Sequence, residues 1–203
     1  MTMAATPAPA LEVHAQHANE EQARLTVLDR YSLIHTFDEP EYDDLVALAC
    51  DIFDAPMATL SLLSPNETFF KARIGLDMAT IPREHSFTSL VLASPVDPVA
   101  VEDATLDARL LGNPYVTGHP HLRAYLAAPV KTADDVVLGA FEVVDVRPRR
   151  WSDREIRHIT TLGSMVEAHL ELRRLLHAST ATSSSVHSGT GRVPSGTVRP
   201  SHS

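Results

Sequence analysis

The sequence predicts an α+β domain in which antiparallel strands lie between helices at the two ends of the chain. Segments with apolar residues at helical spacing occupy residues 20–34, 41–53 and 152–176. Between the second and third of these, two pairs of strand-like segments are each joined by a short polar turn, which is the pattern of a β-hairpin. Hairpins enclosed by terminal helices are typical of an α+β sheet domain.

Two helices are expected before the first strand. The first covers residues 20–34 and has Leu25, Leu28 and Leu33 among its apolar positions. The second covers residues 41–53 and gathers its apolar residues on one face, as a helix packed on a neighbouring layer does. The residues of that face are Leu45, Leu48, Ala49, Ile52 and Phe53.

The middle of the chain contains the expected strands. MATLSLLS (57–64) alternates, turns, and returns as TFFKARIG (68–75), which predicts a first hairpin. VAVED (99–103) is expected to form a short strand that ends in acidic residues. RAYLAAPV (123–130) and VVLGAFEVVDV (136–146) flank a polar turn and predict a second hairpin.

The last helix has a recognisable start and two apolar stripes. Ser152 and Glu155 have the spacing of a capping box, and Trp151 precedes them as a candidate hydrophobic staple. One stripe contains Ile156, Ile159, Gly163, Val166 and Leu170, and a second contains Leu162, Met165, Leu172 and Leu176. One stripe is enough to pack the helix on its own sheet. The second predicts a homodimer through the terminal helices, with Met165 and Leu172 in the contact. Packing by the N-terminal helices of the same chain is the alternative.

Composition excludes several classes of protein. The chain has 203 residues and a formal net charge of −9, with a pI near 5.6, whereas nucleic-acid and anionic-membrane binders need a dominant positive field. No apolar run approaches membrane-spanning length. The single cysteine, Cys50, allows no internal disulfide and lies at helical spacing among apolar residues. We therefore expect a cytoplasmic protein that binds neither nucleic acid nor membrane.

The two ends differ in composition from the middle. We expect residues 1–19 to form a disordered N-terminal tail and residues 177–203 a disordered tail rich in Ser, Thr and Gly, because such segments bury too little apolar surface to become ordered. The folded domain is then expected at residues 20–176.

Five fragments in this order and spacing resemble the GAF domain, a small-molecule sensor module of bacterial signalling. They are LDRYSLIHTFDEPEYDDLVALACDIFDAPMATLSLL, FFKARIGLDMATIPREHSF, VEDATLDARLLGNPYVTG, LRAYLAAPV and LGAFEVVDVRPRRWS. The resemblance covers about residues 25–176. It implies a central antiparallel sheet with the terminal helices on one face. On the other face it implies a ligand pocket roofed by short helices and loops, with Ser86 and Phe87 at the start of one short helix.

The chain departs from this family at positions of pocket chemistry. Relatives usually have a cysteine after the Ser-Phe pair and often a histidine two residues later, where this chain has Thr88 and Leu90. Relatives often have a second cysteine where this chain has Glu142, and Ala124 and Ala127 replace an expected aromatic residue and an expected glycine. The ligands of thiol-bearing relatives are therefore not expected here.

The candidate ligand contacts combine polar residues of the expected roof and strands. They are Arg73, Ser86, Phe87, Thr88, Arg109, Asn113, Arg123, Tyr125 and Glu142. Arginines beside the hydroxyls of Ser86 and Thr88 would hold a carboxylate or phosphate group. In the structural alternative, Asp103 caps a short helix at residues 104–111 and Asp107 pairs with an arginine.

Glu142 interrupts an apolar strand and points away from Phe141 and Val143. Its carboxylate is expected either half-solvated at the pocket floor or paired with an arginine. We favour the pair, with Arg123 or Arg73 as the partner. His119 and His121 alternate in a loop, a pattern that rarely converges on one ion without further ligands, so no metal and no cofactor are expected.

The functional expectation is a non-catalytic regulatory module that binds an unidentified small molecule. It would signal through a partner protein or through self-association. The alternative is an interaction or dimerisation protein that has lost ligand binding, and a more remote alternative is a thiol-independent enzyme. Thiol-based sulfoxide reduction needs an exposed, activated cysteine, and Cys50 lies outside the expected pocket segments.

Overall fold

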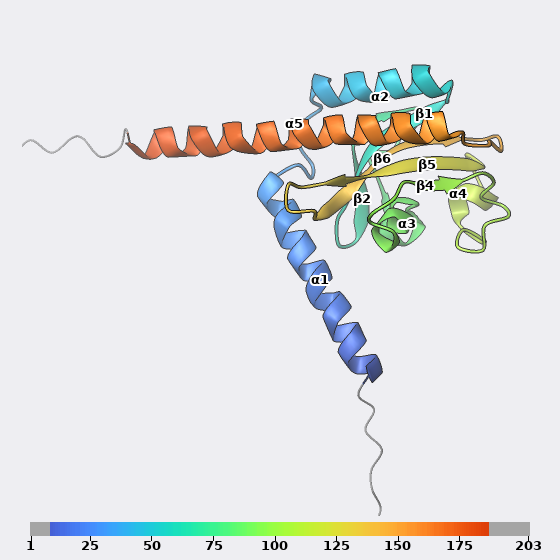
Figure 1. Cartoon of the computed structure of the whole chain (residues 1–203), viewed down its shortest axis with the longest axis horizontal. Coiled ribbons are helices and arrows are strands. Elements are labelled where there is room, and N and C mark those ends of the chain that lie inside the picture. Colours follow the sequence, from blue (N-terminus) through green and yellow to red (C-terminus); the bar gives the residue numbers. More distant parts are fainter. Residues whose placement is uncertain (1–8, 187–203) are drawn as a thin grey trace, which may run out of the picture. The chain divides into compact units, whose positions relative to one another are not determined.

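The computed structural model describes residues 9–186 (Figure 1). The elements follow in the order α1 (Pro9–Tyr31), α2 (Pro40–Phe53), β1 (Met57–Leu63), β2 (Glu67–Ile74), β3 (Thr80–Pro82), the 3-10 helix η1 (Arg83–His85), α3 (Thr88–Ala93), β4 (Val99–Val101), α4 (Pro114–Thr117), β5 (Ala124–Lys131), β6 (Val137–Asp145) and α5 (Asp153–Val186). The chain falls into two units that meet inside α5, after Glu171. The sheet and the site described below belong to the first unit, and the described part of the second is the continuation of α5.

The strands form one antiparallel sheet in the order β3-β2-β1-β6-β5-β4. Both expected hairpins are confirmed, β1 with β2 and β5 with β6. The two central strands, β1 and β6, are far apart in sequence, and their pairing joins the two hairpins. In this register Thr59 lies opposite Glu142 and Ser61 lies opposite Ala140. The environment of Glu142 is set by that register.

Alternate residues of the central strands enter two separate cores, as the two-residue period of a strand requires. Phe141 and Val143 of β6 join a core with residues of α2 and α5, whereas Ala140 and Val144 join a second core with residues around α3 and α4. Figure 1 shows α2 and α5 along one face of the sheet and α3 and α4 at the other. The expected division into a helix-covered face and a face roofed by short helices is confirmed.

The long helix α5 starts as its sequence predicts. The backbone N–H of Ser152 donates to Glu155 Oε2 at 2.8 Å, and the N–H of Glu155 faces Ser152 Oγ at 3.3 Å, so the capping box is confirmed. Trp151 is buried and donates from Nε1 to the carbonyl of Val101 at 3.1 Å. This contact attaches the start of α5 to the edge strand β4.

The two stripes of α5 differ in burial. Ile159, Val166 and Leu170 of the first stripe are buried against the sheet, which confirms the intrachain packing of that stripe. Of the second stripe, Leu162 is also buried, whereas Met165 is 43% exposed and Leu172 is 54% exposed. The exposed members leave an apolar surface on the helix.

Three expected boundaries differ from the structure. Residues 9–19 lie in α1 and residues 177–186 lie in α5, although both were expected in the tails; residues 1–8 and 187–203 fall outside the described residues. The first helix ends at Tyr31 rather than at residue 34. The prediction of a short helix at residues 104–111 is wrong, because this segment forms successive turns. In these turns the carboxylates of Asp103 and Asp107 accept the backbone N–H groups of Thr105 and Arg109, so aspartate–backbone bonds replace a helical ladder.

Candidate functional site

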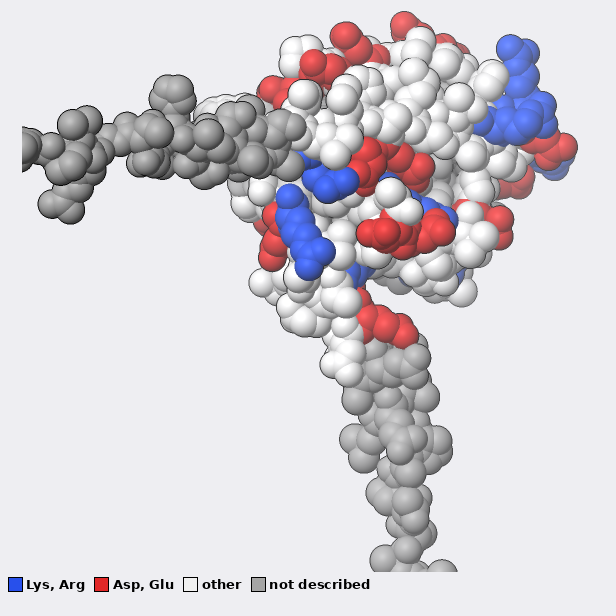
Figure 2. All heavy atoms as spheres, turned by 60° about the vertical axis from the view of Figure 1, so that its left-hand side comes forward, with Lys and Arg blue, Asp and Glu red and all other residues white. Residues whose placement is uncertain are grey.

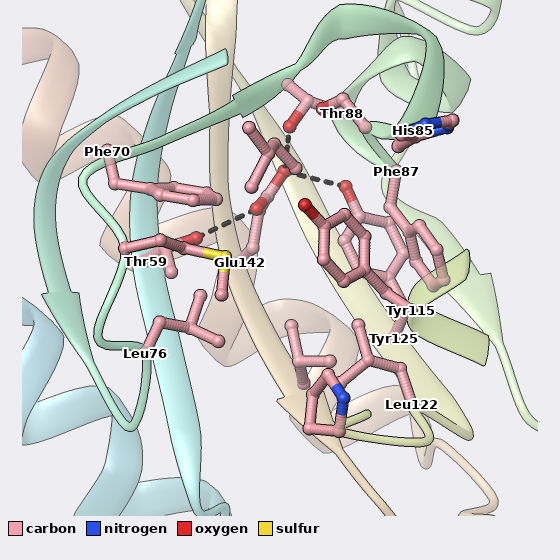
Figure 3. Close-up of a pocket in the computed structure, with 15 residues that line it drawn as sticks. Thr59, Phe70, Leu76, His85, Phe87, Thr88, Tyr115, Leu122, Tyr125 and Glu142 are labelled. Carbon is pink, nitrogen blue, oxygen red and sulfur yellow. Dashed lines mark hydrogen bonds between the residues drawn. The ribbon is translucent and has the colours of Figure 1, made fainter. Parts of the chain in front are cut away.

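A pocket lies between the sheet and its roof of loops and short helices. The lining residues come from β1, β2, β3, β5, β6, η1, α3, α4 and the loops beside them (Figure 3). They are Thr59, Phe70, Leu76, Met78, Ile81, His85, Ser86, Phe87, Thr88, Tyr115, Pro120, Leu122, Tyr125, Glu142 and Val144. The cavity volume is about 50 Å³, which accommodates a few water molecules or a very small ligand. Its walls are mostly apolar and aromatic, with Glu142 as the carboxylate.

Four hydroxyl groups surround the carboxylate of Glu142. Thr59 Oγ1 and Ser61 Oγ donate to Oε2 at 2.8 Å and 2.7 Å, and Thr88 Oγ1 and Tyr125 Oη donate to Oε1 at 2.6 Å and 2.8 Å. Figure 3 shows these bonds converging on Glu142 from the strand of Thr59, from the roof at Thr88 and from Tyr125. A carboxylate has about four acceptor positions, so the hydroxyls match its full hydrogen-bonding capacity.

Burial and hydrogen bonding act on Glu142 in opposite directions. The residue is only 4% exposed, and burial raises the pKa of its carboxyl above the usual value of 4.5, while the hydroxyl donors partly offset that rise. Burial and the neighbouring charge of Glu142 also raise the pKa of Tyr125 well above its usual range, so Tyr125 remains a phenol that donates a proton. The pocket floor is therefore a buried carboxyl group whose oxygens face hydroxyl groups in place of water.

The local sequence explains how these hydroxyls meet. Thr59 and Ser61 alternate with Leu60 and Leu62 along β1, so both polar side chains lie on the face opposite the helix-covered core. Antiparallel pairing then places Thr59 directly opposite Glu142. Thr88 is the first residue of α3, so the roof supplies a hydroxyl above the carboxylate.

The aromatic wall is held by ring contacts between lining residues and by Asn113 behind them. Phe87 meets Tyr125 edge to face, with ring centroids 5.4 Å apart, and His85 meets Tyr115 at 6.3 Å. Asn113 caps α4 by accepting the N–H of Tyr115 at 2.9 Å, and its Nδ2 donates to the carbonyl of His85 at 2.9 Å. Asn113 therefore positions two lining residues although it does not line the pocket itself.

One lining hydroxyl has no protein partner. Ser86 is 6% exposed, and its Oγ makes no hydrogen bond in the described structure. Buried polar side chains are usually hydrogen-bonded, and an unsatisfied one costs about 1–3 kcal/mol. This hydroxyl is thus available to a molecule in the cavity.

The structure brings together five of the nine candidate contacts named from the sequence. Ser86, Phe87, Thr88, Tyr125 and Glu142 line the pocket. Arg73, Arg109, Asn113 and Arg123 lie outside this lining.

Each arginine has a place outside the cavity. Arg73 borders a separate polar hollow with Asp38 and Asp43. Arg109 pairs with Asp107, with Nη2 and Oδ2 2.6 Å apart. Arg123 makes a two-pronged pair with Asp103, at 2.8 Å and 2.6 Å. The expected pairing of Asp107 with an arginine is confirmed, whereas Asp103 pairs with Arg123 and caps no helix.

The expected partner of Glu142 is also corrected. No arginine reaches its carboxylate among the described residues; its partners are the four hydroxyls. A carboxylate or phosphate group bound by an arginine pair is not supported either, because the described lining contains no Lys or Arg. The expected arginine site for an anion is not formed, because Asp103 and Asp107 pair with Arg123 and Arg109.

Sequence reasoning missed the polar side of β1. The signal was present as Thr59 and Ser61 at alternate positions of MATLSLL, which places two hydroxyls on one face of an expected strand. The wall residues Phe70, Leu76 and Tyr115 were missed as well. Leu76 and Tyr115 come from segments without strand periodicity. Phe70 comes from β2, and the sequence does not show which residues pack against that strand.

Other site types find little support in the described residues. They contain no group of three or more His, Cys, Asp and Glu side chains that would hold a metal ion. Cys50 lies on α2, outside the pocket lining, and burial together with the charge of Asp51 raises the pKa of its thiol. Within the described range, no helix combines the length and apolarity needed to cross a bilayer.

Comparisons with known proteins agree with this architecture. A family model for the GAF domain matches residues 39–170. A cyclic di-GMP phosphodiesterase of Pseudomonas aeruginosa is 33% identical over 160 residues; the match covers 78% of this chain but 27% of that protein's length.

Solved structures show the same fold at low identity. The GAF domain of a phosphoenolpyruvate-protein phosphotransferase from Coxiella burnetii has 17% identity and a TM-score of 0.57 over 76% of this chain and 96% of that one. The PixJ GAF domain of Thermosynechococcus elongatus in its blue-light absorbing form has 19% identity and a TM-score of 0.55 over 80% and 95%. The chain therefore belongs to the GAF domain family, whose members are typically sensor or regulatory modules.

Proposed function

We propose that this chain is a regulatory module without turnover of its own, which responds to a small molecule bound in the pocket above Glu142. The observation that supports this most strongly is the buried carboxylate in its ring of hydroxyls, next to the unpartnered hydroxyl of Ser86. Small-molecule sites combine apolar walls with a few polar groups that converge on one point, and this pocket has that composition.

The arrangement costs stability, which argues against a purely structural role. Replacing buried ionic groups with well-packed apolar ones is often neutral or stabilising. Glu142 and the four hydroxyls occupy a sheet face whose other positions, such as Ala140 and Val144, are apolar. A ligand that uses this polar cluster would give a reason for keeping it.

The absence of turnover is proposed from the chemistry of the lining. Thiol-dependent reactions of this fold need an activated cysteine near the ligand, and the single cysteine of the chain lies on α2 with a raised pKa. The lining hydroxyls of Thr59, Thr88 and Tyr125 already donate to Glu142.

The output of the module is proposed to be self-association or contact with a partner protein. Met165 and Leu172 of α5 are exposed, as are Leu48 and Ile52 of α2. Helices α2 and α5 run side by side in opposite directions, because Tyr42 contacts His169 and Phe53 contacts His158. These exposed apolar residues on two adjacent helices support a homodimer.

Nucleic acid is not proposed as a partner. On the face shown in Figure 2, Lys and Arg side chains are interspersed with Asp and Glu and form no continuous basic patch among the described residues. The net charge of −9 agrees with this distribution, because nucleic-acid binding depends on neutralising phosphates.

The Pseudomonas aeruginosa relative supports a signalling context. It is named as a cyclic di-GMP phosphodiesterase, and this chain spans about a quarter of its length (27%). We therefore assign to this chain a regulatory role comparable to one segment of such a protein, and not the hydrolysis itself.

Native mass spectrometry of the purified full chain, followed by a thermal-shift screen of metabolites, tests the proposal. A co-purified ligand, or a metabolite whose thermal shift disappears in Tyr125→Phe, supports it. Arg123→Ala is the matched control, because Arg123 lies outside the lining. Failure of every metabolite to shift the wild type would favour the second candidate, an interaction protein that has lost ligand binding. The cavity volume of about 50 Å³ favours that candidate, since ligand pockets commonly reach about 300–1,000 Å³.

A further inference from the structure

We infer that the pocket selects a small organic cation with N–H donors, such as a guanidinium, amidinium or primary ammonium group. The inference rests on the proposed function, because it names the chemical class of the ligand for the same pocket. It depends on four features of the cavity: its charge, the orientation of its hydroxyls, its aromatic walls and its size.

The pocket contains a buried acidic group without a cationic partner. Glu142 is held by hydroxyls, and no ion pair to it exists among the described residues. The same fold pairs its other buried charged side chains among the described residues: Lys71 Nζ lies 2.7 Å from Glu39 Oε1, Arg24 pairs with Glu21 and Asp145 pairs with Arg149. A cation in the cavity would supply the missing countercharge for Glu142, whereas an anion would be repelled in a low-dielectric site.

The hydroxyls around Glu142 present acceptors to the cavity. Each hydroxyl has one proton, and Thr59, Thr88 and Tyr125 direct theirs at the carboxylate. Thr59 Oγ1 also lies 2.9 Å from Ser61 Oγ, whereas the oxygens of Thr88 and Tyr125 keep lone pairs that can accept. Donation to a carboxylate strengthens an oxygen as an acceptor through cooperativity. A ligand at this end of the cavity must therefore donate hydrogen bonds.

Ser86 adds an independent observation. Ser86 lines the pocket, and its Oγ is buried and has no partner among the described residues. A hydroxyl accepts or donates equally well, so a donor-rich ligand satisfies Ser86 while it also meets the acceptor oxygens.

The walls suit a cation with an apolar or planar body. Phe70, Phe87 and Tyr115 line the cavity beside Tyr125 (Figure 3), and aromatic faces attract cations through their quadrupoles. The arginines that would favour an anion, Arg109 and Arg123, are already paired with aspartates outside the pocket. The volume of about 50 Å³ limits the occupant in this conformation to a group of few atoms.

Three planar molecules of similar shape but different charge test the inference: guanidinium, urea and nitrate. Each is titrated to tens of millimolar into the full chain labelled at its methyl groups, because ligands of so few atoms bind weakly. The signals of Leu76, Leu122 and Val144, which line the pocket, report occupancy. We expect guanidinium to shift these signals at lower concentration than urea, and nitrate to leave them unchanged.

Variants assign the effect to the carboxylate. Glu142→Gln keeps the size of the side chain and is expected to weaken guanidinium binding by about tenfold or more, because it removes the negative charge that would attract a cation in a low-dielectric site. Urea binding should change much less, and Arg123→Ala should change neither. Tyr125→Phe gives a second comparison if Glu142→Gln fails to fold, since it removes one acceptor and keeps the ring.

Each outcome decides the inference. Failure of guanidinium to shift the pocket signals, or shifts by urea or nitrate at equal or lower concentration, would overturn the cation assignment. Those results would leave the proposed function standing if the metabolite screen finds a neutral or anionic ligand whose binding Tyr125→Phe abolishes. A native mass spectrum without a bound ligand, together with a metabolite screen that gives no thermal shift, would instead refute the proposed function.

Discussion

Replacing Glu142 with Gln should change how the stability of the protein depends on pH. Burial raises the pKa of Glu142 in the folded state, against partial opposition from its hydroxyl donors, whereas the unfolded chain has a carboxyl pKa near 4.5. The folded state therefore binds the proton more tightly than the unfolded state. The contribution of this group to stability is fully present below about pH 4.5 and is lost as the pH rises through the folded pKa.

The difference in unfolding free energy between Glu142→Gln and the wild type isolates this term, because all other groups titrate alike in both proteins. The difference should be small in acid, where both side chains are neutral and of equal size. It should then grow in favour of the variant by about 1.4 kcal/mol for each pH unit between the unfolded and folded pKa values. Above the folded pKa it should remain constant.

Urea unfolding between pH 4 and pH 8, followed by the fluorescence of Trp151, the only tryptophan, measures this difference. Glu155→Gln is a control of opposite sign. Burial raises the pKa of Glu155, but hydrogen bonds from Ser152 outweigh that effect, so its pKa is lowered overall. Glu155→Gln should therefore reduce the free energy of unfolding most near neutral pH and least in acid. A pH-independent difference for Glu142→Gln, or one that shrinks with rising pH, would refute the reasoning. Carbon NMR titration of the Glu142 carboxyl in the wild type provides the same test without a substitution.

Three further predictions follow from the packing. Gly139→Ala should cost about 3 kcal/mol or more in urea unfolding, because a Cβ at Gly139 would lie 1.8 Å from the carbonyl oxygen of Ser61 on β1; wild-type stability would contradict this register. Met165→Glu combined with Leu172→Glu should convert a homodimer into a folded monomer in light scattering, since both side chains are exposed; a monomeric wild type at micromolar concentration would remove the dimer proposal. Cys50 should react with iodoacetamide at neutral pH more slowly than it does in the unfolded chain, because burial and Asp51 raise its pKa; equal rates would contradict that environment.

The sequence by itself determined the features that depend on neighbouring residues. The capping box of Ser152 and Glu155 and both hairpins follow from local spacing, and each is confirmed. The apolar face of α2 is confirmed only in part, because Leu45, Ala49 and Phe53 are buried whereas Leu48 and Ile52 are exposed. The two-residue period of β6 also showed that Glu142 faces away from Phe141. Such patterns are readable because helix and strand periods fix the face on which a side chain lies.

Tertiary structure alone decided which groups meet on that face. The donors to Glu142 come from Tyr125, Thr88, Ser61 and Thr59, which are 17, 54, 81 and 83 residues away in sequence. Their meeting depends on the register of β1 against β6 and on the path of the roof. Sequence periodicity contains neither, because a strand's period gives the direction of a side chain but not the identity of its neighbour.

The arginines show the same limit of prediction from sequence, because their partners are also set by the fold. Arg123 or Arg73 was expected to pair with Glu142, yet the carboxylate of Asp103 binds Arg123 instead. Two charged groups pair only where the fold brings them close together, because the attraction between them falls with their separation and with the water between them. The sequence therefore indicated a polar pocket, and only the folded chain determined that its buried carboxyl group has hydroxyl partners and no countercharge from the described residues.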